Sequence, residues 1–153
     1  MWRDEIPWPL VWDATRETLI MLGASLAFAV PIGLVIGVLI FLTSPGNFWQ
    51  QTWVYRLLSL VVNVLRSVPF VILLIYVMPL TRLLVGTSIG VEGAIPPLVI
   101  AAAPFFARMT EISLREVDRG VLEAAEAMGT PRLVIIWRVL LREARGGLMA
   151  GVT

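Results

Sequence analysis

The stretch TLIMLGASLAFAVPIGLVIGVLIFL, residues 18–42, decides the class of fold because it contains no charged side chain. At a rise of about 1.5 Å per residue, a helix of this length crosses the roughly 30 Å hydrocarbon core of a bilayer. Its flank carries Asp13 and Glu17 rather than the basic cluster of a signal peptide. We therefore expect an uncleaved membrane-spanning helix.

Small residues recur at every fourth position along this stretch, at Ser25, Ala29, Gly33 and Gly37. The spacing allows the backbone of a second helix to approach closely. Small residues are also common in any membrane helix, so the pattern alone leaves a specific packing role open.

The composition extends this class to the whole chain. Of its 153 residues, 58% are hydrophobic and only 15% are charged, whereas soluble domains are nearer half apolar and a quarter charged. We predict an all-α fold, a polytopic bundle of membrane helices. The absence of cysteine and histidine excludes disulfides and the commonest metal ligands and general base. We expect no catalytic, metal or cofactor-binding residue in this chain.

Two further spans are predicted, at about 57–80 and 94–107, with a connecting loop over 81–93. The second span contains Arg66, and Pro69 is expected to kink or end it. Arg66 has two interpretations: an interfacial anchor that fixes topology, or a partner for a carboxylate or for helix carbonyls near a gate. No substrate-contacting residue can be named.

The segment after residue 107 is far more polar than the rest. Most of the twelve basic residues, all arginines, lie there, at Arg108, Arg115, Arg119, Arg132, Arg138, Arg142 and Arg145. The positive-inside rule places this end in the cytoplasm, and three spans then place the N-terminus outside. The predicted organisation is an extracytoplasmic segment 1–17, a transmembrane region 18–107 and a cytoplasmic segment 108–153.

The cytoplasmic segment reads as short helices. A helix over 108–119 would pair Glu111 with Arg115, and a shorter helix would follow over 121–128. Gly129 has the position of a helix stop that needs a positive φ. One face of the short helix would be small and apolar, consisting of Val121, Ala124, Ala127 and Met128. This face suits either a groove of another protein or packing on the rest of this chain.

A longer amphipathic helix is predicted next, with Thr130 as N-cap, Pro131 in its first turn and Gly146-Gly147 at its end. Its apolar side would consist of Leu133, Ile136, Val139 and Leu140. Its polar stripe, formed by Arg138, Arg142 and Arg145, is interpreted as a surface that faces phospholipid.

The stretch EAAEAMG followed by VLLR resembles the EAA loop of ABC importer permeases. That motif reads Glu-Ala-Ala, three residues, Gly, nine residues, then Ile-x-Leu-Pro. The matching residues are Glu123, Ala124, Ala125, Gly129, Val139 and Leu141, with Arg142 in place of the proline. The resemblance implies that these residues couple the chain to an ATPase, with Glu123 either pairing with a cation of that partner or capping helix backbone amides.

Three more stretches are similar to the methionine-import branch of this family: LRSVPF (65–70), MPLTRLLVGTSIG (78–90) and AAAPFFARMTE (101–111). The resemblance implies five spans, two permease chains, two ATPase chains that hold ATP and Mg²⁺, and an extracytoplasmic substrate-binding protein. Members continue for two more spans, so a C-terminally truncated permease is expected here.

The sequence therefore predicts a permease subunit of an ATP-driven amino-acid importer of the bacterial inner membrane, with methionine as favoured substrate. The chain has no lysine and so no P-loop of its own, which places ATP hydrolysis on a partner. The alternative is a non-transporting membrane anchor that docks a cytoplasmic partner through residues 120–145. An intramembrane enzyme lacks the convergent nucleophile and base it would need.

Overall fold

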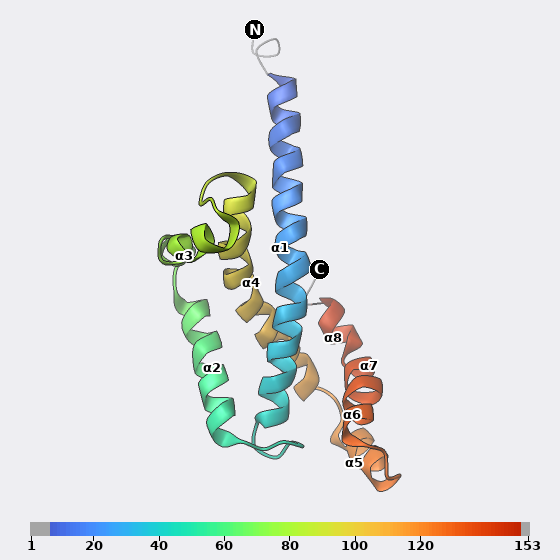
Figure 1. The fold of residues 1–153 in the computed structure, drawn as a ribbon. Helices are drawn as coiled ribbons and strands as arrows, with labels where there is room; N and C mark the ends of the chain where they lie inside the picture. The colour runs from blue at the N-terminus through green and yellow to red at the C-terminus, as the bar shows by residue number, and fades with distance from the viewer. Residues whose placement is uncertain (1–6, 151–153) are drawn as a thin grey trace.

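The computed structural model describes residues 7–150, and every regular element in that range is a helix. The elements are α1 (Trp8–Thr43), α2 (Thr52–Ser67), α3 (Phe70–Val85), α4 (Gly90–Arg115), α5 (Arg119–Ala127), α6 (Arg132–Val134), the π-helix η1 (Ile135–Leu140), α7 (Leu141–Glu143) and α8 (Arg145–Ala150). Figure 1 shows α1 and α4 side by side and α3 lying across the bundle, with α5 at the end of the molecule opposite the start of α1. The all-helical class is confirmed.

The small-residue ladder of α1 is the surface against which α4 packs. Ser25, Ala29, Gly33 and Gly37 are all buried. A Cβ added at Gly33 would lie 2.7 Å from the carbonyl oxygen of Ala103, and one at Gly37 would lie 2.5 Å from that of Ala107. The two backbones therefore approach as closely as small residues permit, and the packing role that the sequence left open is real.

The predicted second span is sharply bent, and the kink expected at Pro69 is confirmed. The break lies at Val68 and Pro69, and the axes of α2 and α3 differ by 112°. Pro69 has no N–H to continue the ladder of hydrogen bonds and caps α3 with φ −57° and ψ 136°. In residues 7–150, α1 and α4 are each long and apolar enough to cross a membrane, and the bent pair makes a third span if counted as one.

The predicted loop over 81–93 is shorter in the structure, and this part of the prediction was wrong. Helix α3 runs to Val85, Gly86 caps it with φ 82°, and α4 begins at Gly90. Helix α4 then continues through residue 107 to Arg115 without interruption. The change in polarity that suggested a boundary there does not interrupt the backbone hydrogen bonds of α4, which do not depend on the polarity of the side chains.

A hydrophobic cluster joins the C-terminal helices to the ends of α1 and α4. Its buried members are Phe41, Leu42, Leu114, Leu122, Ala125, Ile135, Ile136, Leu140 and Ala144. The loop after α1 adds polar contacts: Asn47 donates to the carbonyl of Phe41, and Arg132 donates to the carbonyl of Phe48 at 3.1 Å. The C-terminal segment is therefore fixed to the bundle.

The predicted second C-terminal helix differs from the structure in three ways. Pro131, not Thr130, occupies the N-cap position. The π-helical turn of η1 buries Ile135 in place of Leu133, which is exposed. The helix ends before Gly146-Gly147, at Glu143, and the two glycines lie inside the separate helix α8. A Cβ on Gly147 would lie 2.7 Å from Ser113 Oγ, so this glycine permits α8 to pack on α4.

Candidate functional site

The EAA-type motif forms a bent, protruding segment that we call the knuckle, residues 119–131, comprising α5 and the turn after it. Asp118, directly before the knuckle, is the N-cap of α5, because its carboxylate accepts a hydrogen bond from the backbone N–H of Gly120 at 2.8 Å. Asp118 was missed in the sequence, although aspartate directly before a helix is an ordinary N-cap signal. The cap satisfies one of the free N–H groups at the helix start.

A Schellman motif closes the knuckle. Gly129 has φ 73°, its N–H donates to the carbonyl of Glu126 at 2.9 Å, and the N–H of Thr130 donates to that of Ala125 at 3.2 Å. This pair of hydrogen bonds defines the motif, and the left-handed residue in it is usually glycine. Gly129 therefore ends α5 and sets the direction of the next helix, as its position in the sequence predicted.

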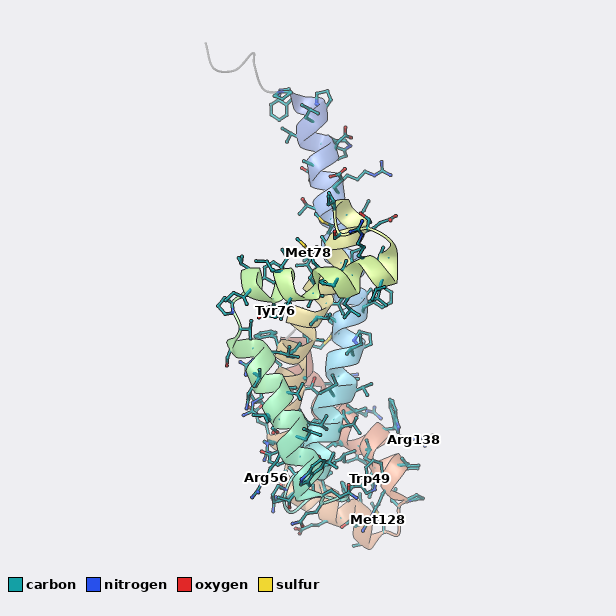
Figure 2. All side chains as sticks on the ribbon, turned by 60° about the vertical axis from the view of Figure 1, so that its left-hand side comes forward. Trp49, Arg56, Tyr76, Met78, Met128 and Arg138 are labelled. Carbon is teal, nitrogen blue, oxygen red and sulfur yellow. The ribbon has the colours of Figure 1, made fainter. Side chains whose placement is uncertain are left out.

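The two sides of α5 have different environments. Leu122 and Ala125 are buried in the hydrophobic cluster. The predicted small apolar face, formed by Val121, Ala124, Ala127 and Met128, is exposed, and the Met128 side chain retains 78% of its accessible area. Figure 2 shows Met128 at the extreme end of the molecule. We call this exposed face the tip of the knuckle, and Leu122 and Ala125 its root. An exposed apolar tip on a buried root is suited to docking in a groove of another protein.

A cleft of about 260 Å³ lies between α5 and the loop after α1. Its lining residues are Gly46, Asn47, Phe48, Arg119, Leu122, Glu123, Glu126 and Arg132. Glu123 and Glu126 are exposed, and neither forms an ion pair within residues 7–150. Their carboxylates are thus available to a cationic group from outside the chain.

The second half of the motif supports the knuckle from inside. Val139 and Leu141 are partly buried and pack against the hydrophobic cluster. Arg142, which stands where the family motif has proline, lies in α7 and is exposed. Val139 and Leu141 therefore position the exposed residues Glu123 and Ala124 rather than share their surface.

Arg66 and Pro69 lie elsewhere. Arg66 is exposed in the last turn of α2, at the end of that helix away from the loop that follows α1 (Figure 1). It forms no ion pair within the described part of the chain. The structure therefore separates Arg66 from the knuckle, and Pro69 sets the bend between α2 and α3.

An ion triad around the buried residue Glu111 lies near the end of α4, shortly before the knuckle. The side chain of Glu111 is only 2% exposed, accepts a hydrogen bond from Arg115 at 2.9 Å and also pairs with Arg108. The predicted pairing of Glu111 with Arg115 is confirmed, and Arg108 is an additional partner. Two arginines on one carboxylate compensate for its removal from water.

Comparisons with known proteins agree with this architecture. The profile of a family described as "Binding-protein-dependent transport system inner membrane component" matches residues 29–153. The chain is 49% identical over 147 residues to the D-methionine transport system permease protein MetI of Salmonella typhimurium, covering 94% of this chain and 68% of the relative. It is 50% identical over 143 residues to the methionine import system permease protein MetP of Bacillus subtilis, covering 94% and 64%.

A solved structure is similar as well. In the native crystal form described as inward-facing conformations of the MetNI methionine ABC transporter, one chain matches with a TM-score of 0.89 and 46% identity, covering 94% of this chain and 68% of that one. The predicted family resemblance is confirmed. The profile covers most of the chain and close relatives share its fold, so the chain belongs to the binding-protein-dependent transport system inner membrane component family of membrane permeases.

Proposed function

We propose that this chain is the permease subunit of an ATP-driven methionine importer and that the knuckle receives the movement of a separate ATPase. The substrate is supported by relatives named as D-methionine and methionine import permeases. The coupling role is supported by one observation above all: the knuckle exposes its tip while its root is buried among the ends of α1 and α4.

The proposed transmission follows the contacts. ATP, with Mg²⁺, is bound and hydrolysed by the partner chains, and closure of those chains moves the tip of α5. Leu122 and Ala125 pass that movement to Phe41, Leu42 and Leu114 through the cluster they share. Because packed interiors transmit strain with little compression, α1 and α4 move with the knuckle.

The proposed assembly contains two permease chains, two ATPase chains and an extracytoplasmic substrate-binding protein in the bacterial inner membrane. The knuckle lies on the cytoplasmic side and the N-terminus outside, an orientation supported by the arginine-rich C-terminal segment. Glu123 pairs with a cation of the ATPase, and Ala124 permits close seating because its side chain is small and exposed.

The test is Gly129→Val in the assembly isolated with its ATPase and reconstituted in vesicles. A β-branched side chain disfavours φ 73°, so the turn changes shape and the tip leaves its seat. We expect ATP hydrolysis to continue while methionine uptake per ATP falls. The readouts are radiolabelled methionine uptake and phosphate release.

The matched control is Gly86→Val. Gly86 also has a positive φ, 82°, and, like Gly129, has no neighbouring atom within 4 Å of an added Cβ, but it lies at the end of α3. The control should preserve uptake per ATP. An equal loss in both variants, or a normal ratio in the Gly129 variant, would contradict the coupling role, and absence of uptake without any substitution would contradict the transport function.

The alternative, a membrane anchor that recruits the ATPase without transport, is favoured by the fact that α5, its N-cap Asp118 and its closing turn all lie within residues 118–130. The same preparation separates the two functions. Stimulation of ATP hydrolysis by methionine and the binding protein supports the importer, and binding of the ATPase without stimulation supports the anchor.

A further inference from the structure

Two neighbouring clefts lie along the C-terminal helical segment. One, of about 620 Å³, is lined by Trp137, Arg138, Leu141, Arg142 and Arg145, and we call it the arginine cleft. The other, of about 150 Å³, runs between the final turns of α1 and residues 133–141 and is lined almost wholly by apolar atoms. We call it the apolar groove. Trp137 and Leu141 line both, so the two clefts lie side by side.

The charges of the arginine cleft are not balanced within residues 7–150. Arg138, Arg142 and Arg145 are exposed and form no ion pair there. Arg108 and Arg115, in contrast, are both paired with Glu111. Figure 2 shows Arg138 at the outer margin of the molecule, away from the bundle. Three unpaired guanidinium groups beside one cleft make a site for an anion with several oxygen acceptors.

The π-helix arranges this surface. Ile135 and Leu140, five residues apart, are both fully buried in the hydrophobic cluster, which is the separation of one π-helical turn. The same turn leaves Trp137 with 67% of its area exposed and Arg138 exposed on the other side. An aromatic ring between an apolar groove and basic groups is typical of a membrane interface.

We propose that one anionic glycerophospholipid binds here, with an acyl chain in the apolar groove and its phosphate on Arg138, Arg142 and Arg145. The groove follows α1 from Leu34 to Leu42, which is part of a helix apolar enough to span the bilayer, so a lipid chain reaches it from the membrane. A free phosphate would leave the groove empty, and a zwitterionic lipid would leave the arginine charge uncompensated. Only an amphiphile with a net negative head matches both clefts.

The first experiment is lipid binding to the purified chain in neutral detergent, measured by native mass spectrometry. Phosphatidylglycerol is expected to bind at least about tenfold more tightly than phosphatidylcholine, since each basic residue near an anionic surface adds a several-fold preference. The variant Arg138→Gln/Arg142→Gln/Arg145→Gln should lose this preference.

The matched control is Arg16→Gln/Arg56→Gln/Arg82→Gln. It removes the same number of exposed, unpaired arginines from α1, α2 and α3. The control should keep the preference for phosphatidylglycerol. Equal loss in both triple variants would show a general charge effect and overturn the proposal, and so would an unchanged preference in the first variant.

The second experiment tests the groove. Val35→Trp places a large ring in the apolar groove from an exposed position. The control, Ile20→Trp, adds the same ring at an exposed position of α1 that does not line the groove. Only the first should weaken phosphatidylglycerol binding, with circular dichroism showing that both variants fold. Glycerol 1-phosphate, which has the head but no tail, should bind far more weakly than the lipid. Equal affinity for both ligands would mean an anion site only and would overturn the proposal.

Discussion

Two regions of the molecule depend on glycine for opposite reasons: one is the contact of α1 with α4, and the other is the knuckle. Gly33 and Gly37 have ordinary helical backbones and are needed because the α4 backbone lies within 3 Å of where a Cβ would be. Gly129 has open space around it and is needed because its φ is 73°. Crowding keeps α1 and α4 in close contact, whereas backbone geometry shapes the tip that, in the proposed mechanism, moves these two helices.

The largest effect is expected for Gly37→Leu, which tests the close approach of α1 and α4. Its Cβ would lie 2.5 Å from both the Ala107 oxygen and the Thr110 Cβ, and backbone atoms cannot move aside as a flexible side chain can. We expect a loss of about 3 kcal/mol in the free energy of unfolding, measured by thermal unfolding in detergent. Gly23→Leu on the same helix meets no atom within 4 Å and should leave the melting temperature nearly unchanged. Similar melting of both variants would show that α1 does not depend on close approach to α4.

The next largest effect is expected for Glu111→Gln, at the end of α4 where the two regions meet. The substitution leaves Arg108 and Arg115 without their shared carboxylate, and the amide cannot carry the compensating charge. The arginines are 33% and 45% exposed and can turn to water, so we expect about 2 kcal/mol rather than the full cost of a buried broken pair.

The control for that substitution is Glu116→Gln, one turn later, where the carboxylate is exposed and forms no ion pair within the described residues. Its unfolding free energy should change by less than about 0.5 kcal/mol. If Glu111→Gln lowers the free energy of unfolding as little as Glu116→Gln does, the ion triad around Glu111 does not stabilise α4.

A smaller effect is expected for Asp118→Ala, which removes the N-cap of α5 and leaves the N–H of Gly120 unpaired. The loss of such a cap costs about 1 kcal/mol. Because α5 is short, the change should appear as faster amide hydrogen exchange in α5 with no change in α1. Asp13→Ala, inside the exposed first part of α1, is the control. Equal protection of α5 in both variants would show that the cluster contacts alone hold the knuckle.

Residues whose role depends on near neighbours in the chain were predicted well. The positive φ of Gly129, the grouping of small residues on one face around Ala124 and the pairing of Glu111 with Arg115 follow from spacing along one helix. The charge-free stretch 18–42 likewise predicted a spanning helix, and the ladder from Ser25 to Gly37 indicated where a partner could pack. Local hydrogen bonding and side-chain periodicity determine all of these features.

Features that depend on distant segments came only from the tertiary structure. Gly147 resembles a helix stop, yet it lies where Ser113 of α4 leaves no room for a Cβ. The π-helix buries Ile135 instead of Leu133 because the cluster formed by α1 and α4 sets which residues must face inward. The sequence predicted a kink or an end at Pro69, but not the 112° angle between α2 and α3. It also did not predict that the arginine cleft lies beside the apolar groove along α1. Periodicity along a chain specifies which residues can pack, but only the partner surface in space decides what they pack against.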